Sequence, residues 1–173
     1  MLQLKTTAIV RKFIGIKGSE LIDKVSDSSV LGAWYVNLFF IERRKALIFL
    51  NERTLLSFII YGVRKDNTRN LPGVLCRGLY QLLSFADVDP VLIDRVLSEY
   101  ETYCYSKTDS KRVLGNMNEI VFLYQHHIQY EGGLQNCDLT DITFKVNQTP
   151  QRNIGWDFSL DLAMSLIKNE TAI

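Results

Sequence analysis

The sequence predicts an α+β fold, with an antiparallel sheet built mainly from the N-terminal half and three to four helices from the C-terminal half packed against it. Three aromatic and β-branched runs follow one another between Trp34 and Tyr61, which is typical of neighbouring strands. Apolar residues at helical spacing dominate after Pro72. Strands followed by helices are typical of α+β domains. With 173 residues and no long linker, the chain is expected to form one domain, residues 1–173.

The predicted sheet lies in the N-terminal half. The chain begins with a short strand at 2–5, followed by a short helix that is expected to end near Gly15 or Gly18. The second and third central runs are apolar on both faces, which predicts a sheet covered on both sides. The charged segment 42–45 between the first two runs is expected to be an exposed hairpin tip. The central strands are predicted at 34–42, 46–50 and 54–61.

The predicted helices follow. Pro72 and Pro90 suit the first turn of two helices, and Asp89 can cap the second, which is expected to run to about residue 103. A longer helix begins within the stretch 107–119 and has an unbroken apolar stripe. The stripe consists of Val113, Met117, Ile120, Val121, Tyr124 and Ile128, and Gly132–Gly133 stops the helix. The remaining elements are predicted as a strand at 138–146 and a closing helix at 157–169.

Composition indicates a soluble, cytoplasmic protein. The apolar fraction of 47% and the charged fraction of 23% are ordinary globular values, and no apolar run reaches the ~18 residues that span a bilayer. The N-terminus lacks the apolar core of a signal peptide. Cys76, Cys104 and Cys137 are widely spaced and odd in number, which argues against a disulfide framework or a zinc site and favours reduced thiols.

The usual signatures of catalysis are missing from the sequence. It has no phosphate-binding loop, no dinucleotide-binding glycine motif, no nucleophile elbow and no His-Glu-x-x-His motif. The adjacent His126 and His127 point about 100° apart on a helix, so they do not readily share a metal. We therefore expect no metal and no cofactor, and we assign no catalytic residue. These absences favour a protein that is not an enzyme, but they do not exclude an enzyme.

The start of the long helix is the best candidate for an anion-binding site. Either Thr108 or Ser110 can cap the helix, and Lys107, Lys111 and Arg112 surround the exposed backbone N–H groups. Cations there oppose the helix dipole, which is unusual in a helix start that serves only stability. The alternative is a structural helix start in which Asp109 offsets the cations.

Two further polar groups extend this candidate ligand site. Asn118 is a poor helix former at the expected boundary between core and surface, which predicts a side-chain hydrogen bond either to a neighbouring element or to a ligand. Asn51, Glu52 and Arg53 lie between two predicted strands. They form either a simple turn or part of the same site, for example through pairing of Glu52 with Arg112.

Aromatic and charged surfaces suggest which partners to expect. Trp34 and Tyr35 are candidates for a stacking surface, although isolated aromatics are more often core. The basic hairpin tip suits a phosphate backbone, but the net charge of +1 does not favour nucleic acid. Residues 1–69 have twelve Lys and Arg against six Asp and Glu, whereas 70–173 have eight against thirteen. This asymmetry suits a protein partner or a homo-oligomer, unless the two halves simply interleave; no membrane partner is expected.

Three short motifs together resemble a known family. They are, in order, Trp34-Tyr35-x-Asn37, Asn51-Glu52-Arg53-Thr54 and Ser110-x-x-Val113-Leu114-Gly115-x-Met117-Asn118. This set resembles a family of small bacterial proteins known only as a domain of unknown function. The resemblance spans the chain from the N-terminal strand through the long helix and implies a common fold. It implies no activity, cofactor or catalytic residue.

Two hypotheses about function follow. The first is a non-catalytic binding or regulatory module that acts on a protein partner in a bacterial cell or mobile element. The second is a phosphate-handling protein that binds or processes nucleotides or RNA through the basic helix start, with Glu52 as the only obvious general base. The two differ in whether the polar segments 51–53 and 112–118 converge on an open cleft.

Overall fold

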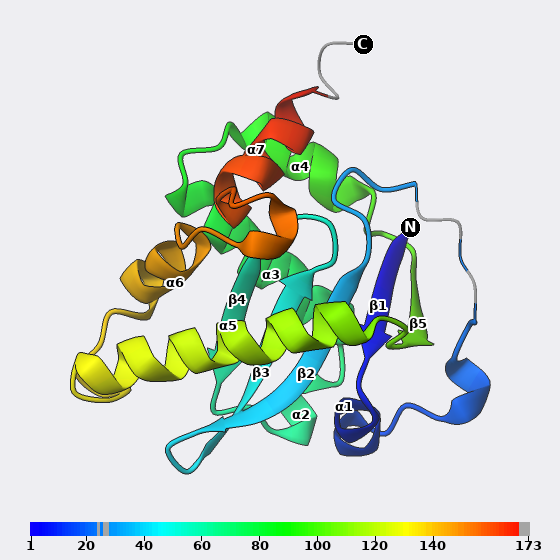
Figure 1. The fold of residues 1–173 in the computed structure, drawn as a ribbon. Helices are drawn as coiled ribbons and strands as arrows, with labels where there is room; N and C mark the ends of the chain where they lie inside the picture. The colour runs from blue at the N-terminus through cyan, green and yellow to red at the C-terminus, as the bar shows by residue number, and fades with distance from the viewer. Residues whose placement is uncertain (24, 26–27, 170–173) are drawn as a thin grey trace.

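The computed structural model describes residues 1–23, 25 and 28–169, and shows a five-stranded sheet with helices on both faces (Figure 1). The strands lie in the order β4–β3–β2–β1–β5, so that β4 and β5 form the two edges. Their bounds are β1 Leu2–Thr6, β2 Trp34–Ile41, β3 Arg44–Asn51, β4 Ser57–Tyr61 and β5 Tyr103–Lys107. The predicted α+β class is confirmed.

The sheet is mixed, and the prediction of a purely antiparallel sheet is wrong. β2, β3 and β4 form the expected antiparallel ribbon, but β1 runs parallel to both β2 and β5. Strand β5 was not predicted, because the second helix ends at Ser98 instead of near residue 103. The five residues that follow pair with β1, whose outer backbone groups would otherwise lack partners.

In the described part of the chain, seven α-helices cover the sheet. Their bounds are α1 Ala8–Ile14, α2 Lys65–Thr68, α3 Leu71–Phe85, α4 Pro90–Ser98, α5 Lys111–Tyr130, α6 Leu139–Asn147 and α7 Ser159–Asn169, with 3-10 turns at Gly18–Glu20 and Arg152–Ile154. One core lies between the sheet and helices α1, α3, α4 and α7, and a second lies under α5 and α6. The predicted sheet covered on both sides is confirmed. Because α1, α2 and α3 arise before the chain midpoint, the predicted division into a strand half and a helix half holds only roughly.

Alternation along the strands distributes side chains between these two cores. Trp34 and Val36 of β2 face the first core, whereas Tyr35 between them faces the second. Strand β3 does the same, with Phe49 on one face and Ile48 on the other. This period of two is what a strand buried on both faces requires.

Helix α6 replaces the strand predicted at 138–146. The side chain of Asp138 accepts hydrogen bonds from the backbone N–H groups of Thr140 and Asp141, at 2.9 and 3.1 Å, and so caps a helix. Ile142 and Val146, four residues apart, then enter the second core together. The cap and this spacing outweigh the strand preference of the β-branched residues.

Several other predictions are confirmed. Asp89 caps α4, whose first residue is Pro90, and Gly15 ends α1 with a φ of +83°. The turn between β2 and β3 lies at 42–43, inside the predicted hairpin tip. In the described part of the chain, the three cysteines form no disulfide with one another. Within the described residues, no helix is long and apolar enough to cross a membrane.

Candidate functional site

A buried lysine joins three distant segments where α5 begins. The Nζ atom of Lys5, on β1, lies 2.8 Å from Glu52 Oε2 and 2.9 Å from Asp109 Oδ2. The Lys5 side chain is only 9% exposed, and its ammonium lies 5.4 Å from the centre of the Tyr35 ring. Burial acts to lower the pKa of Lys5, but the hydrogen bonds to Glu52 and Asp109 outweigh it, so the pKa lies above its ordinary value.

The hydroxyl of Tyr35 completes this cluster. It donates a short hydrogen bond to Asp109 and accepts one from the backbone N–H of Ser110 at 3.1 Å. Burial, together with the hydrogen bond to Asp109, raises the pKa of Tyr35. Burial also acts to raise the pKa of Asp109, but the hydrogen bonds from Tyr35 and Lys5 outweigh it and lower the pKa. At neutral pH the cluster therefore holds one ammonium, a neutral phenol and an ionised Asp109.

This cluster places negative charge at the positive end of the α5 dipole. Ser110 caps the helix, since its hydroxyl accepts from the backbone N–H of Val113 at 3.3 Å. Asp109 lies just before the helix, and the ion pair of Lys5 with Glu52 holds a second carboxylate nearby. Together the two carboxylates offset the positive charge around the helix start. An incoming phosphate would have to displace Asp109 from both Lys5 and Tyr35. As it stands, the arrangement fastens α5 to the sheet.

The cations proposed for an anion site surround this helix start without contributing to the cluster. Lys107, Lys111 and Arg112 are all exposed. Asn118 is exposed too, so its expected position at the boundary of the core is wrong. The buried amide is Asn116, whose side chain accepts a short hydrogen bond from the amide of Asn153.

The segment 51–53 serves mainly as a structural turn. The buried Asn51 accepts hydrogen bonds from the backbone N–H groups of Arg53 and Thr54, at 3.1 and 3.0 Å, and donates to the carbonyl of Leu31 at 2.7 Å. The guanidinium of Arg53 donates to the backbone carbonyls of residues 29 and 30, at 3.2 and 3.1 Å. Both side chains thus hold the loop before β2 in place.

Only Glu52 from this segment reaches the start of α5. In the described part of the chain it pairs with Lys5 and not with Arg112, which was the expected partner. The two aromatic candidates for stacking are both fully buried. Trp34 lies in the first core and donates from its indole to the hydroxyl of Tyr100 at 2.9 Å, so neither ring offers a face to a ligand.

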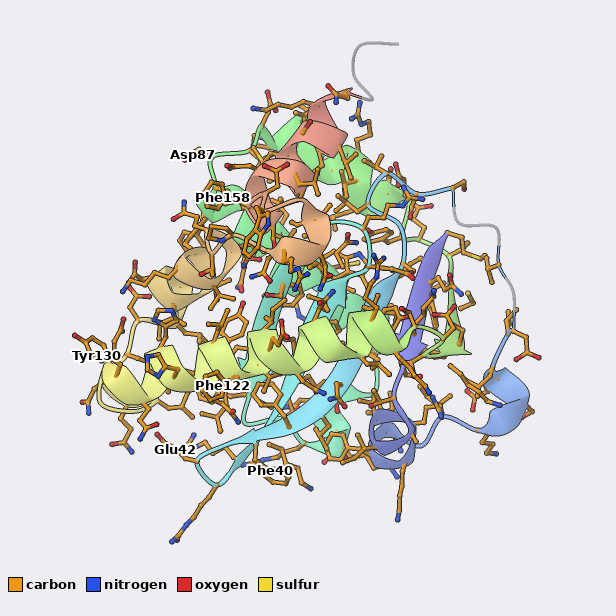
Figure 2. All side chains as sticks on the ribbon, viewed as in Figure 1. Phe40, Glu42, Asp87, Phe122, Tyr130 and Phe158 are labelled. Atoms are coloured by element: carbon orange, nitrogen blue, oxygen red, sulfur yellow. The ribbon has the colours of Figure 1, made fainter. Side chains whose placement is uncertain are left out.

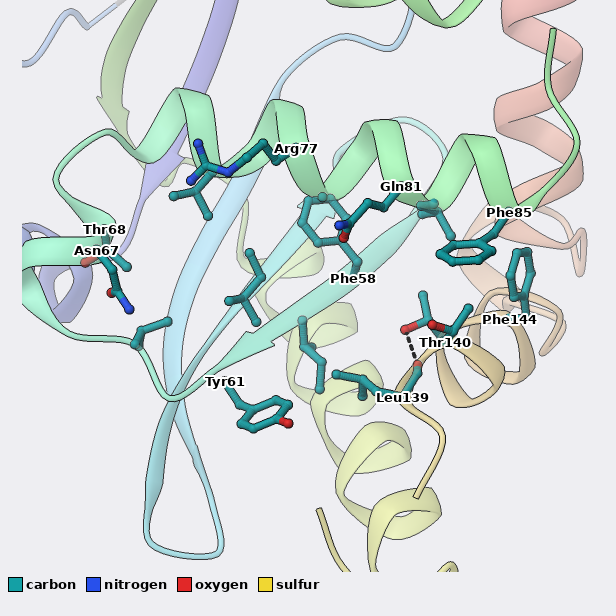
Figure 3. A pocket seen from close by; sticks show the side chains of 17 residues that line it. Phe58, Tyr61, Asn67, Thr68, Arg77, Gln81, Phe85, Leu139, Thr140 and Phe144 are labelled. Carbon is teal, nitrogen blue, oxygen red and sulfur yellow. Dashed lines mark hydrogen bonds between the residues drawn. The ribbon is translucent and has the colours of Figure 1, made fainter. Parts of the chain in front are cut away.

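A groove of about 460 Å³ lies beside the edge strand β4 (Figure 3). Strand β4 forms its floor, and helices α3 and α6 form its two walls. The lining is mostly apolar, and Arg77 is the only charged residue in it. Its volume lies within the range of about 300–1,000 Å³ that is usual for ligand pockets.

The floor of this groove includes a sheet edge with outward-facing backbone groups. The backbone N–H of Asn51 donates to the carbonyl of Leu56 at 2.8 Å. This bond shows which residues of β4 direct their backbone groups toward β3. In an antiparallel pair, the backbone N–H and C=O groups of successive residues point alternately toward the neighbouring strand and away from it. The backbone groups of Phe58 and Ile60 therefore bond to β3, whereas those of Ser57, Ile59 and Tyr61 face away from it. The groove thus lies along the bonding side of an edge strand.

Asn147, at the end of α6, closes the first of these outward positions. Its amide nitrogen donates to the Ser57 carbonyl at 2.8 Å, and its amide oxygen accepts from the Ser57 N–H at 2.9 Å. The carboxamide therefore stands in the place of a residue from a neighbouring strand. Among the described residues, the backbone groups of Ile59 and Tyr61 have no such partner.

A glycine on α3 allows the floor of the groove to lie close to the helix. A Cβ atom at Gly78 would lie 2.2 Å from Cε2 of the Phe58 ring. The ring occupies that space and stacks on Phe49, with centroids 5.0 Å apart. The absence of a side chain at Gly78 therefore brings α3 and β4 together at this wall.

A second cleft of about 570 Å³ lies near the far end of α5, beside the β2–β3 hairpin. Figure 2 labels Phe40, Glu42, Phe122 and Tyr130 in this region, and all three aromatic residues are exposed. The cleft is lined by His126, whose ring stacks on that of Phe122. Among the described residues, no group of three or more His, Cys, Asp or Glu could hold a metal ion.

Sequence reasoning missed the residues that define both regions. Lys5 was overlooked, because it lies in a strand of mixed polar and apolar residues, LQLKT, where a lysine is not conspicuous. Asn147 was placed just beyond a predicted strand, and nothing local shows its partner 90 residues earlier. Neither the groove nor the second cleft is lined by a residue that was predicted as a ligand-binding candidate.

The comparisons with known proteins agree with the resemblance seen in the motifs. The family model DUF6933, described as a domain of unknown function, matches residues 3–162. The comparison with curated proteins gives no match.

Proposed function

Because the chain belongs to DUF6933, a family described as a domain of unknown function, we propose its function from its own geometry: it is a non-catalytic module that binds an extended segment of a protein partner. The observation that carries this proposal is the outer edge of β4 at the floor of an apolar groove, where, among the described residues, the backbone groups of Ile59 and Tyr61 have no partner strand. An edge strand offers a row of backbone donors and acceptors to another chain.

Strand addition is the binding mode that this groove supports. Backbone hydrogen bonds supply affinity in this mode, and pockets for alternate side chains supply specificity. Ile59 and Tyr61 together offer two N–H and two C=O groups, each bond contributing about 0.5–1.5 kcal/mol net. The apolar walls add the burial of the partner's side chains, at roughly 25 cal/mol per Å².

The groove favours a single extended segment over the edge of another sheet. Helices α3 and α6 stand on both sides of β4, so a flat sheet would meet both walls before its strand reached the floor. A short edge by itself is a common protection against unwanted pairing. Here, however, the edge has an apolar cavity next to it, which protection alone does not require.

We further propose that the partner is met in the cytoplasm of a bacterial cell or is encoded by a mobile element. Among the described residues, Cys76, Cys104 and Cys137 form no disulfide with one another, which suits a reducing compartment. The phosphate-handling alternative has less support from the geometry. Its cations are exposed, but Glu52 and Asp109 already neutralise Lys5, an ammonium that is buried beside the α5 start.

Selection of peptides from a displayed random library, with the full chain as bait, tests the proposal. We expect enriched peptides whose binding is lost in Tyr61→Pro, because proline removes an outward N–H without touching the bonds to β3. The matched control Tyr61→Ala keeps that N–H and should bind markedly more tightly than Tyr61→Pro.

A second variant guards against a folding defect in the proline variant. Thr140→Trp fills the groove from an exposed position on α6 and should also abolish binding. Thermal unfolding of each variant confirms that it is folded. The proposal is wrong if no peptide is enriched, or if the enriched peptides bind both blocked variants as well as they bind the parent.

A further inference from the structure

We propose that the groove beside β4 selects a three-residue pattern, apolar–acidic–apolar, in a segment that runs antiparallel to β4. This inference rests on the proposed function, because it specifies the chemistry of the same site. Three structural features carry it: the two ends of the free edge, the faces to which its side chains point, and the charge of one wall.

The length of the pattern follows from where the free edge begins and ends. Asn147 occupies the partner position of Ser57, so no other chain can bond there. Beyond Tyr61, Gly62 adopts a φ of +69° and ends the strand. A bound segment can therefore pair only along Ile59–Tyr61, which corresponds to three of its residues.

The way Asn147 bonds is compatible with an antiparallel segment, which is also the commoner pairing in sheets. Its carboxamide exchanges both hydrogen bonds with the single residue Ser57. This is the pattern of a bonded pair in an antiparallel ladder, whereas a parallel strand bonds each residue to two different partners. A segment that continues this pattern runs antiparallel to β4, with its N-terminus near Gly62.

The side chains of the segment divide between the two walls. Residues directly opposite each other in a ladder point to the same face of the sheet. Ile59 packs into the core under α5 and α6, whereas Ile60 packs against the core that contains α3. The two outer residues of the segment, opposite Ile59 and Tyr61, thus face α6, and the middle residue faces α3.

The chemistry of the two walls then sets the pattern. The α6 wall offers Leu139 and the methyl-bearing Thr140 and Thr143, which suit apolar side chains. The α3 wall carries the exposed guanidinium of Arg77, and Figure 3 shows it next to the groove. With no acidic residue in the lining to neutralise Arg77, a carboxylate in the middle position is the complementary group.

The same logic argues against a second copy of β4 as the occupant. In an antiparallel pair of β4 strands, the residue facing α3 would be an isoleucine or a phenylalanine. The strand sequence SFIIY contains no carboxylate, so Arg77 of each copy would stay unpaired beside an apolar side chain. The occupant is therefore an acidic segment of a different protein.

The selection described above also tests this pattern. We expect the enriched peptides to align on Asp or Glu with an apolar residue on each side. In a synthetic peptide, replacing the acid by its amide should weaken binding about tenfold, and Arg77→Glu in the protein should weaken it at least as much. A lysine in the middle position should restore binding to Arg77→Glu. Arg43→Ala, at the exposed hairpin tip, is the matched control and should have no effect.

Backbone modification and a spin label test register and direction. Methylation of the backbone nitrogen of either outer residue should abolish binding, whereas methylation of the middle residue should be tolerated. A spin label on the peptide N-terminus should broaden the amide signals near Gly62 more than those near Asn147.

The two levels of the proposal fail in different ways. One outcome is that the selected peptides bind only when the Tyr61 N–H is free, yet contain no acid and bind Arg77→Glu as well as the parent. That result would overturn the pattern and leave strand addition intact. Broadening near Asn147 would overturn the direction. Failure to select any peptide would overturn the proposed function itself.

Discussion

The side chain of Asn147 and the backbone of Ser57, 90 residues apart, exchange two hydrogen bonds of 2.8 and 2.9 Å. A side-chain amide from the last turn of a helix thus stands where a sixth strand would begin. Asn147 is buried and also donates to the carbonyl of Thr143 at 2.8 Å. The contact ties α6 to the sheet, and it limits how much of the β4 edge is open to other chains.

Removing this amide should destabilise the protein measurably. Asn147→Ala leaves the buried Ser57 N–H without an acceptor, so we expect the free energy of unfolding to fall by about 1–3 kcal/mol. Asn136→Ala is the matched control, because Asn136 is exposed and donates only to a local turn carbonyl. It should change stability by less than about 0.5 kcal/mol. Urea unfolding measures both, and equal effects would contradict the assigned role.

Acid should remove the contribution of Asp109. The pKa of Asp109 is lowered in the folded protein, so its ionised form stabilises the fold at neutral pH, and this contribution is lost as the pH falls through the lowered pKa. Asp109→Asn removes the titration. Since the carboxylate is 63% exposed, we expect a deficit of no more than about 1 kcal/mol near pH 7, shrinking below roughly pH 4.

Unfolding of parent and variant across pH 3–8 measures this prediction. The exposed Asp94, on α4, provides the control: Asp94→Asn should leave stability nearly unchanged at every pH. A deficit of Asp109→Asn that stays constant between neutral and acid pH would show that the ion pair with Lys5 does not contribute in the manner described.

Two glycine-to-alanine substitutions on helices should have opposite effects. At Gly78 a Cβ would lie 2.2 Å from the Phe58 ring, so Gly78→Ala should destabilise the protein by about 1–3 kcal/mol. At Gly115, on α5, a Cβ would meet nothing within 4 Å. Gly115→Ala should therefore stabilise it by about 0.5–1 kcal/mol. Thermal unfolding distinguishes them, and a neutral Gly78→Ala would show that the α3 wall yields easily.

Phosphate compounds test the second functional hypothesis. Because Asp109 already occupies Lys5 and Tyr35, we expect inorganic phosphate, nucleotides and short oligonucleotides to leave the melting temperature of the parent unchanged. Asp109→Ala vacates that position, and phosphate should then stabilise the variant. Stabilisation of the parent by a nucleotide, abolished in Arg112→Ala, would instead support a phosphate-handling function.

Local patterns were sufficient to predict most elements of the fold. The antiparallel ribbon of β2, β3 and β4, the capped α4 and the long α5 all follow from periodicity, caps and turn residues within a few positions of each other. β5 did not, because five residues after a helix carry no signal of a parallel partner 100 positions earlier. α6 did not follow from local patterns either, because its β-branched residues favour a strand. The helix forms because Asp138 caps it.

The candidate site was harder to predict than the fold. The expected site combined polar residues near one another in sequence, such as Lys111 and Arg112, and these turn out to be exposed side chains. The groove instead depends on backbone groups that one strand leaves unpaired, which no residue type reveals. Asn116 and Asn118 show the same difficulty: they lie two positions apart on one helix, yet Asn116 is buried and Asn118 is exposed.

The position of β1 between β2 and β5 has a consequence for synthesis. Of the five strands of this sheet, β1 is made first and must wait for its second neighbour: the side chain of Gln3 bonds to that of Ser106, 103 residues later. At about 5–20 residues per second, that wait lasts roughly 5–20 s. During it, the nascent chain displays the whole five-residue edge of β1, whereas the edge that β5 keeps in the finished protein is partly covered by a bridge between Leu21 and Tyr105. Wrong pairing is therefore a greater hazard for the unfinished chain than for the native fold.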